Sequence, residues 1–329
     1  MVNPLVSVVV CSYDREGTLG LALESLACQE TGGEFEFEIV LVDDGSTDGT
    51  REVVRRVAER FRAPLRCIRE SGRGVPFARN RGVEEARGEW IAFFDDDQIA
   101  GRDWLRELMR TALETGAPIV GGVRRLQFLG EAPPEVAPMT REVLGEKYYG
   151  PRARRSNRYT LACTGNVLVR RDLFDRIGRF DTAMHRGMSD IDLMRRAFDA
   201  GVDAWYTPRA VVQHLIPPYR LGETYLKWTS LRTGTNLSQI NHKSWGPLRM
   251  FLPCLLRVGH AMTLNAVLAA AAHLTRRPAV VVGRRCYRWM AEGSARMALH
   301  LALPRIFPQK EFLGQLDFRG ERRAFSGGD

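Results

Sequence analysis

Several signatures are missing from this sequence, and each absence removes a class of proteins. None of the six cysteines forms a C-x-x-C pair and most lie in apolar surroundings, so we expect reduced, buried thiols in a cytosolic protein. We expect no signal peptide, because the first apolar run, residues 5–10, is short and ends in polar residues. No G-x-G-x-x-G motif follows that run, which argues against a Rossmann dehydrogenase.

Acidic residues are scarce in the last third of the chain. Residues 216–329 contain 17 basic and 6 acidic side chains, a net charge of +11, whereas residues 1–215 contain 31 basic and 33 acidic ones, a net charge of −2. A basic segment can contact nucleic acid, anionic lipid or a phosphorylated substrate. Because the rest of the chain is close to neutral, we expect no nucleic-acid partner.

Short β-branched runs alternate with segments of helical spacing over the first hundred residues. This alternation predicts an α/β fold with a mostly parallel sheet and helices on both of its faces. The predicted strands are residues 5–10, 37–42, 65–68 and 90–94, and the predicted helices are residues 18–29, 50–61 and 75–86. Later elements are a helix at 103–115, strands at 118–123, 161–169 and 204–213, helices at 172–177 and 189–200, and a surface excursion at 130–157.

Polar clusters follow three of these strands. They are Ser12-Tyr13-Asp14, Asp43-Asp44-Gly45-Ser46 and Asp95-Asp96-Asp97. Ligand sites in such sheets lie at the carboxyl ends of the strands, so we expect the three clusters to converge on one edge. Hard divalent cations prefer carboxylate oxygens and keep diphosphate oxygens as further ligands, which makes the aspartate triplet a candidate cation site. A solvated acidic loop is the alternative.

The stretch V-D-D-G-S-T-D-G-T allows two interpretations. Ser46 or Asp48 can cap the helix that begins at Thr50. Capping does not require Asp44, for which we favour contact with a ligand. Further along, Ser189 and Asp192 resemble a capping box, and acidic residues favour the first turn of a helix in any case.

Asp190 lies in the same first turn and is our candidate general base. A carboxylate at this position can take the proton of an attacking hydroxyl if it faces the cleft.

Taken in order, these motifs resemble a family 2 inverting glycosyltransferase of the GT-A fold, which uses nucleotide sugars. The likeness covers about residues 5–215. It rests on V-S-V-V-V-C-S-Y-D-R-E, V-D-D-G-S-T-D, A-R-N-R-G, F-F-D-D-D-Q, T-G-N-V-L-V-R-R with G-R-F-D, S-D-I-D-L and V-V-Q-H. The resemblance implies that Tyr13 packs against the nucleotide base with Cys11 beside it. Asp44 then accepts the N–H of the base, and Arg79 approaches the nucleotide.

The resemblance also implies a cation site and a base. Asp95 and Asp96 would lie near the ribose and the metal, and Asp97 would coordinate Mn²⁺ or Mg²⁺. His214 would be a further metal ligand, although a packing histidine at a strand end is the alternative. Asp190 would activate the acceptor hydroxyl for in-line displacement, which inverts the anomeric configuration.

Some positions depart from the family pattern. Cys11-Ser12 replaces the usual Pro-Thr, and Ser189 replaces an acidic residue, which leaves Asp192 as a fallback base. The string Arg285-Cys-Tyr-Arg-Trp289 has Arg where the Q-x-x-R-W motif of processive synthases has Gln, so we expect transfer of a single sugar.

We expect three parts in the chain. Residues 1–100 are the nucleotide-sugar-binding half, 101–215 the acceptor-binding half, and 216–329 a basic helical extension. Eighteen residues between Arg257 and Arg276 contain no Lys, Arg, Asp or Glu. We favour an amphipathic helix on an anionic membrane surface over a spanning helix, a soluble cap or a dimer surface.

Rival functions fit less well. A haloacid dehalogenase-type phosphatase would use a D-x-D and a D-G-x-x-D motif, but here they occur in the reverse order. A nucleotidyltransferase would need a glycine-rich loop near the N-terminus. An inactive sugar-nucleotide-binding or scaffold protein is the remaining alternative. We expect a metal-dependent, cytoplasmic enzyme that moves a sugar from a nucleotide-diphosphate donor, with UDP as the first candidate. The acceptor is a hydroxyl group on a glycan, a lipid-linked molecule or another molecule, and the product is part of a cell-surface or secreted glycan.

Overall fold

The computed structural model describes residues 3–60, 65–131, 133–157, 160, 162–184 and 187–308. These residues form two compact units. The first contains the described residues up to 127 and residues 147–215, and the second contains residues 128–146 and those from 216 onward. The functional division at residues 100 and 215 stays a prediction, because compactness does not test donor and acceptor roles.

A sheet of nine strands forms the centre of the first unit among the described residues. Its order is β3-β2-β1-β4-β8-β6-β9-β5, and β7 pairs with β9. The first four strands are parallel, as predicted, and antiparallel pairing begins where β8 meets β4. The bounds are β1 (Leu5–Ser12), β2 (Glu36–Asp43), β3 (Leu65–Arg69), β4 (Trp90–Asp95), β5 (Gln98–Ala100), β6 (Ile119–Phe128), β7 (Arg154–Arg155), β8 (Asn166–Arg170) and β9 (Ala204–Ile216).

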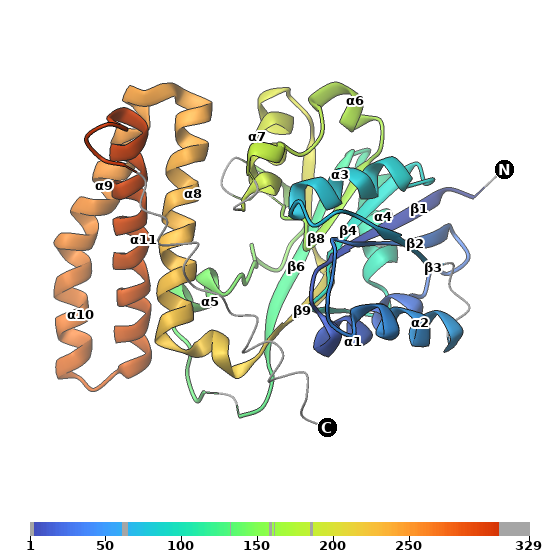
Figure 1. Ribbon diagram of the computed structural model, residues 1–329, viewed down its shortest axis with the longest axis horizontal. Helices are drawn as coiled ribbons and strands as arrows, with labels where there is room; N and C mark the ends of the chain where they lie inside the picture. The colour runs from blue at the N-terminus through green and yellow to red at the C-terminus, as the bar shows by residue number, and fades with distance from the viewer. Residues whose placement is uncertain are drawn as a thin grey trace. The chain divides into compact units, whose positions relative to one another are not determined.

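Helices cover both faces of this sheet, which confirms the predicted architecture (Figure 1). Alternation along β1 explains the two layers, because Val8 and Val10 enter one core while Val9 enters the other. The first core lies under α1 (Glu16–Ala27), α2 (Thr50–Arg60) and α4 (Trp104–Thr115). The second lies under α3 (Val75–Glu85), α6 (Leu173–Ile177) and α7 (Ser189–Asp199), near the short 3-10 turn η1 (Thr182–Met184).

The second unit is helical. It contains α5 (Pro138–Val143), the 3-10 turn η2 (Pro218–Leu221), α8 (Glu223–Arg249), α9 (Phe251–Met262), α10 (Leu264–Leu274) and α11 (Pro278–Ala302). The backbones of α8 and α11 come close together at two glycines, because a Cβ on Gly234 would lie 1.9 Å from the Met290 carbonyl oxygen and one on Gly293 would lie 2.2 Å from that of Leu231. The Oγ atoms of Ser238 and Ser294 are 2.7 Å apart across the same contact.

A few element predictions were incomplete. β5 was missed because its three residues are too short to give a periodic signal, and α5 was missed inside the predicted excursion. The strand predicted at 161–169 begins only at Asn166, and Leu161 lies outside the described residues, as do Phe61 at the end of the second helix and residues 309–329 of the extension.

All six cysteines are free, as predicted, but not all are buried. Cys28 follows the last residue of α1, and Cys67 lies on the edge strand β3, so both side chains reach solvent.

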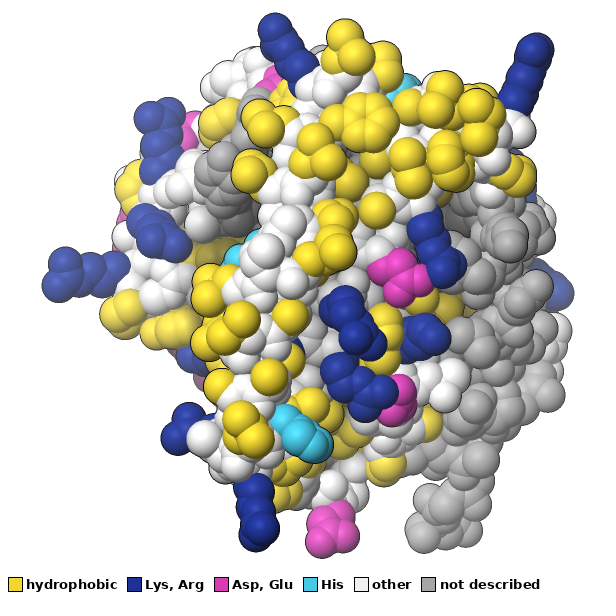
Figure 2. All heavy atoms as spheres, turned by 90° about the vertical axis from the view of Figure 1, so that its left-hand side faces the viewer, with side chains coloured by type: hydrophobic (Ala, Val, Ile, Leu, Met, Phe, Trp, Pro, Cys, Tyr) yellow, Lys and Arg dark blue, Asp and Glu magenta, His cyan; other side chains and the backbone are white. Residues whose placement is uncertain are grey.

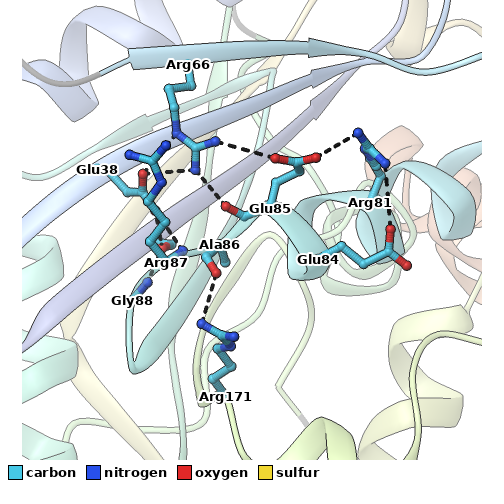
Figure 3. A network of polar contacts seen from close by, with 10 residues as sticks. Glu38, Arg66, Arg81, Glu84, Glu85, Ala86, Arg87, Gly88 and Arg171 are labelled. Atoms are coloured by element: carbon cyan, nitrogen blue, oxygen red, sulfur yellow. Dashed lines mark hydrogen bonds and ion pairs between the residues drawn. The ribbon is translucent and has the colours of Figure 1, made fainter.

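The amino ends of the parallel strands are fixed by a buried carboxylate, Glu38 (Figure 3). Its oxygens accept hydrogen bonds from Ser7 Oγ (2.7 Å), from the Arg87 N–H (2.9 Å) and from two guanidinium nitrogens of Arg66 (3.1 and 3.0 Å). Burial alone would raise the pKa of Glu38, but these hydrogen bonds outweigh it and lower the pKa. This cluster therefore stabilises the edge of the sheet that lies opposite the predicted site.

Candidate active site

The three predicted polar clusters meet at the carboxyl edge of the parallel strands. Cys11 on β1 is the register partner of Asp95 on β4, and Ser12 is the partner of Asp43 on β2. The Asp44 N–H then donates to the Ser12 carbonyl oxygen at 2.9 Å. The chain order of the strands is therefore sufficient to bring together residues that are more than 80 positions apart.

Asp95 is held between two arginines. Its carboxylate lies 3.9 Å from Arg79 Nη2 and 3.5 Å from Arg124 Nη1, and Gln98 Nε2 donates to it at 3.3 Å. Gly165 closes this cluster from one side, because a Cβ there would lie 2.4 Å from Asp95 Oδ2. The glycine of the T-G-N motif thus leaves room for the carboxylate and its partners.

Asp96 and Asp97 are buried and share one arginine. Arg15 Nε lies 3.3 Å from Asp96 Oδ1, and Arg15 Nη2 lies 3.4 Å from Asp97 Oδ2. Burial raises the pKa of Asp96 to about 6; Arg15 opposes this rise, and the nearby charges of Asp97 and Asp95 add to it. At 7% and 5% exposed, Asp96 and Asp97 do not form a solvated loop, so that alternative is wrong.

His214 joins the same cluster from β9. Its Nε2 lies 3.5 Å from Asp97 Oδ1, because β5 pairs with β9 and places Gln98 opposite His214. The Leu215 N–H also donates to the Asp97 carbonyl oxygen at 2.9 Å. His214 therefore lies beside Asp97, and its role as a metal ligand stays a prediction.

The donor set fits a cation that brings further ligands of its own. Asp97 and His214 supply one oxygen and one nitrogen at a separation that a single ion can bridge. The described part of the chain contains no group of three or more His, Cys, Asp or Glu side chains placed to hold a metal. Mg²⁺-type sites with one or two protein ligands complete their shell with substrate phosphates and water.

Asp44 lies at the other end of the same edge. Its Oδ2 accepts the Gly74 N–H at 2.9 Å, whereas its buried Oδ1 has no hydrogen-bond partner among the described residues. Burial raises the pKa of Asp44 although backbone N–H groups oppose the rise. The neighbouring Asp48 caps α2 by accepting the Thr50 N–H at 3.0 Å, and Ser46 instead accepts the N–H of Asp14.

Cys11 and Tyr13 lie at the carboxyl end of β1, beside these carboxylates. Burial raises the pKa of the Cys11 thiol to about 12; Arg79 lowers it, and the charges of Asp96, Asp95 and Asp44 raise it further. Cys11 therefore stays a neutral thiol and serves as a small apolar surface. Tyr13 is 37% exposed directly after β1, where its ring is accessible to a ligand.

Asp190 lies in the first turn of α7, close to Arg79. The hydroxyl of the preceding Ser189 accepts a hydrogen bond from Arg79 Nη1 at 3.1 Å, which ties α7 to α3. Asp190 is half-buried and its Oδ1 accepts the N–H of Ile191 at 2.9 Å. Met188, just before the helix, has a φ of 63°, a strained value for a non-glycine residue of the kind found at functional sites.

The predicted capping box at α7 is wrong. The helix begins without a side-chain cap, because its N-cap residue is Met188 and Ser189 is already the first helical residue, with its hydroxyl accepting a hydrogen bond from Arg79. Asp192 is 4% exposed and paired with Arg196 at 2.9 Å, so it is less accessible to an acceptor hydroxyl than a fallback base would need to be.

Two arginines were missed by the sequence reasoning. Arg15 follows the first polar cluster directly, and its position after a strand end was a usable signal. Arg124 lies on β6, where nothing in the sequence distinguishes it. Burial lowers the pKa of Arg124, but electrostatic interactions with Cys163, Asp95, Asp190 and Asp97 outweigh this effect and raise it.

Comparisons with known proteins agree with this geometry. The model of the family "Glycosyl transferase family 2" matches residues 7–178. Glycosyltransferase AglE of Haloferax volcanii is 27% identical over 218 residues, 66% of this chain and 68% of that protein. Validoxylamine A glucosyltransferase of Streptomyces hygroscopicus subsp. limoneus is 40% identical over 106 residues, which are 32% of this chain and only 23% of that protein. Succinoglycan biosynthesis protein ExoM of Rhizobium meliloti is 25% identical over 231 residues, 70% of this chain and 72% of that protein.

Solved structures with low sequence identity share the fold. Mannosyltransferase PcManGT from Pyrobaculum calidifontis, in complex with GDP-Man and Mn²⁺, has a TM-score of 0.63 at 21% identity, with 93% of this chain and 89% of that chain covered. GalNAc-T7 with UDP, GalNAc and Mn²⁺ has a TM-score of 0.54 at 16% identity, with 70% of this chain and 48% of that chain covered. The sheet has the GT-A architecture, and with the family model matching more than half of its length, the chain belongs to glycosyl transferase family 2 and is a glycosyltransferase.

Proposed function

We propose that the protein is a metal-dependent inverting glycosyltransferase that moves one sugar from a UDP-sugar to a hydroxyl group of a cell-surface or secreted glycan or its lipid-linked precursor. The observation that carries the proposal is the meeting of Asp97 and His214, 3.5 Å apart, at the sheet edge that also holds Asp44 and Asp95. The structural neighbours described above contain nucleotides and Mn²⁺, which supports this class of donor and cofactor. The reaction takes place in the cytoplasm, where nucleotide sugars are made.

The nucleotide base binds beside Asp44, Cys11 and Tyr13. Asp44 Oδ1 is buried without a partner, and a base N–H supplies the missing donor once the adjacent turn opens to admit it. Uracil and thymine both present such an N–H, and the neutral Cys11 and the exposed ring of Tyr13 provide apolar contact. Arg79 lies on the next helix, within reach of the negatively charged part of the donor.

The diphosphate binds at the aspartate triplet. Asp97 and His214 would hold Mn²⁺ or Mg²⁺, and Asp95 and Asp96 would lie near the ribose and the cation. When bound, the cation offsets the negative charge that develops on the leaving diphosphate. Without a cation, Arg15 neutralises Asp96 and Asp97. A bound cation would replace Arg15 in this role.

Asp190 acts as the general base. Its carboxylate takes the proton of the acceptor hydroxyl as that oxygen attacks the anomeric carbon, and the bond to the diphosphate oxygen breaks on the opposite side. One bond forms as the other breaks on the opposite face of the anomeric carbon, so the anomeric configuration inverts. Arg124 interacts electrostatically with both Asp190 and Asp95, so the same guanidinium is near the proposed base and the aspartate triplet.

A donor-binding and turnover experiment tests this function. A thermal-shift screen of nucleotide sugars with Mn²⁺ should give stabilisation by UDP-sugars that disappears with chelator. Asp190→Asn should keep donor binding and lose about 10²- to 10⁴-fold in donor hydrolysis or transfer, the range for one general base. Asp199→Asn, at the exposed end of the same helix, is the matched control and should leave turnover unchanged.

Two results would contradict the proposal at different points. Unchanged turnover in Asp190→Asn removes Asp190 as the base. Metal-linked binding without transfer to any acceptor or to water, in the unmodified protein, favours a sugar-nucleotide-binding protein without catalysis. Absence of metal-linked nucleotide-sugar binding removes the proposed function altogether.

A further inference from the structure

The outer face of α9 and α10 carries large apolar side chains that no described part of the chain covers. Six of them are between 53% and 83% exposed. Isolated exposed leucines are common, but a continuous exposed patch of this kind marks an interaction surface. The six are Leu252, Leu255 and Leu256 on α9 and Leu264, Val267 and Leu274 on α10.

The inner face of the same helices combines small apolar side chains with polar ones. α9 and α10 pack against α11, and Arg257 points inward, where its Nη1 donates to Ser294 Oγ at 2.7 Å. Asn265 is also buried, and its Nδ2 donates to the Arg284 carbonyl oxygen at 3.2 Å. A surface helix of a soluble protein turns its large apolar side chains toward the core, whereas these two helices expose theirs. The outer face is therefore adapted to an apolar medium.

The shape of this segment favours lying on a bilayer over crossing it. By length and composition alone, residues 251–274 are long and apolar enough to cross a membrane. The helix nevertheless breaks at Thr263, with φ −108° and ψ −97°, which gives pieces of 12 and 11 residues. Each piece is roughly 16–18 Å long, and a bilayer core is about 30 Å thick.

The charge of the helical segment from residue 216 onward identifies the kind of surface. Residues 216–308 contain 13 Lys and Arg but only 2 acidic side chains, a net charge of +11. Both acidic residues are already paired, Glu223 with Arg285 and Glu292 with Arg296. Figure 2 shows Lys and Arg side chains lying beside the apolar ones on this face. A surface with apolar and cationic groups side by side complements an apolar phase bordered by anionic headgroups.

We propose that the outer face of α9 and α10 docks on an anionic lipid bilayer, with its leucines at the boundary of headgroups and acyl chains. Exposed arginines at the ends of the segment, Arg249, Arg276 and Arg277, contact the headgroups. A second copy of the chain is a poorer occupant, because docking like faces would bring together two segments, residues 216–308 of each copy, that each carry a net charge of +11. Nucleic acid is also a poorer occupant, because its phosphates can contact the arginines but it offers no apolar phase for the leucines. The docking is independent of the proposed transfer reaction.

Vesicle flotation of the full chain tests this surface. The probes are vesicles of phosphatidylcholine alone and of an equimolar mixture with phosphatidylglycerol. The protein should float with the mixed vesicles and stay at the bottom with the neutral ones, and raised salt should reduce its recovery. The triple variant Leu252→Ser, Leu255→Ser, Leu256→Ser should lower the partition coefficient at least about tenfold, because less apolar area enters the bilayer.

Matched variants separate docking from general effects. Leu113→Ser alters a leucine of similar exposure, 62%, on α4 in the first unit and should not change flotation. Arg276→Gln with Arg277→Gln should weaken recovery on the mixed vesicles, whereas Arg56→Gln on α2 should not. An unchanged melting temperature of the leucine triple variant shows that it still folds.

Three outcomes overturn the proposal. Equal recovery with neutral and mixed vesicles removes the anionic surface, and recovery with neither removes the bilayer. A dimer in sedimentation without vesicles, lost in the leucine triple variant while flotation is absent, assigns the face to a second copy of the chain.

Discussion

Two buried carboxylate clusters lie at opposite edges of the same parallel strands, and they are held in different ways. At the amino edge, Glu38 accepts hydrogen bonds of 2.7–3.1 Å from a hydroxyl, a backbone N–H and a guanidinium group. At the carboxyl edge, Asp96 and Asp97 contact the single guanidinium of Arg15 at 3.3 and 3.4 Å. Both clusters are almost fully buried, so burial alone does not distinguish them.

The pKa values of the two clusters move in opposite directions. For Glu38 the fixed donors outweigh burial and lower the pKa, whereas for Asp96 burial and the neighbouring carboxylates outweigh Arg15 and raise it to about 6. A carboxylate whose donors are complete stabilises the fold. A carboxylate crowded by like charges gains from an additional cation. This difference is the one expected between a structural cluster and the binding cluster that we propose at the carboxyl edge.

The largest effect expected from this comparison is on catalysis. Asp97→Asn removes a charged ligand from the cation site and should lower turnover about a thousandfold, since metal stabilisation of the leaving group contributes several kcal/mol. Glu38→Gln removes an equally buried carboxylate at the other edge and should leave turnover per folded molecule unchanged. Steady-state transfer at saturating Mn²⁺ measures both. Equal losses in the two variants would mean that the clusters do not differ in function.

The next effect is on stability, and here we expect the larger loss at the amino edge. Glu38→Gln should lower the free energy of unfolding by about 2–3 kcal/mol, because charge-assisted hydrogen bonds to Arg66 and the Arg87 N–H are lost. Asp96→Asn should leave the stability of the metal-free protein unchanged or raise it, because repulsion from Asp97 and Asp95 is removed. Urea denaturation of both variants measures the difference. A larger loss in Asp96→Asn would reverse the assignment of the two clusters.

The pH dependence of that difference gives an internal control. Because the pKa of Glu38 is lowered from its ordinary value of 4.5, its contribution is fully present above about pH 4.5 and is lost as the pH falls through the lowered pKa. The gap in unfolding free energy between wild type and Glu38→Gln should therefore be constant near neutral pH. It should shrink only below about pH 4.5.

Much of the carboxyl edge could be predicted because it depends on local sequence. The parallel strands read as short β-branched runs, and strand order alone places the residues after β1, β2 and β4 at one edge. The placement of His214 beside Asp97 was different. It depends on pairing of β9 with the three-residue β5, which leaves no periodic signal, so only the family resemblance suggested it.

The rest depended on contacts that no single segment encodes. The motif at Ser189 and Asp192 has the spacing of a capping box, but Arg79, 110 positions earlier, takes the serine hydroxyl. Arg124 enters the site only because β6 and β8 are neighbours and Gly165 leaves space beside Asp95. At these positions, contacts with residues distant in sequence decide the structure, and local propensity does not. A polar site built from several strands depends on such contacts.

The smallest effect concerns Arg15, which compensates the carboxyl edge in place of a cation. Arg15→Gln removes the guanidinium that lies 3.3 and 3.4 Å from Asp96 and Asp97, so Mn²⁺ no longer competes with it. Binding of Mn²⁺ to the nucleotide-free protein should become up to about tenfold tighter, the range of a partly buried ion pair. Titration calorimetry measures this change, and Arg102→Gln, which alters a surface pair with Glu30, should not affect it. Weaker binding in Arg15→Gln would mean that the arginine holds the two carboxylates in place for the cation. The long contacts of Arg15 with Asp96 and Asp97 would then indicate a preformed cation site, and Arg15 would not compete with the cation.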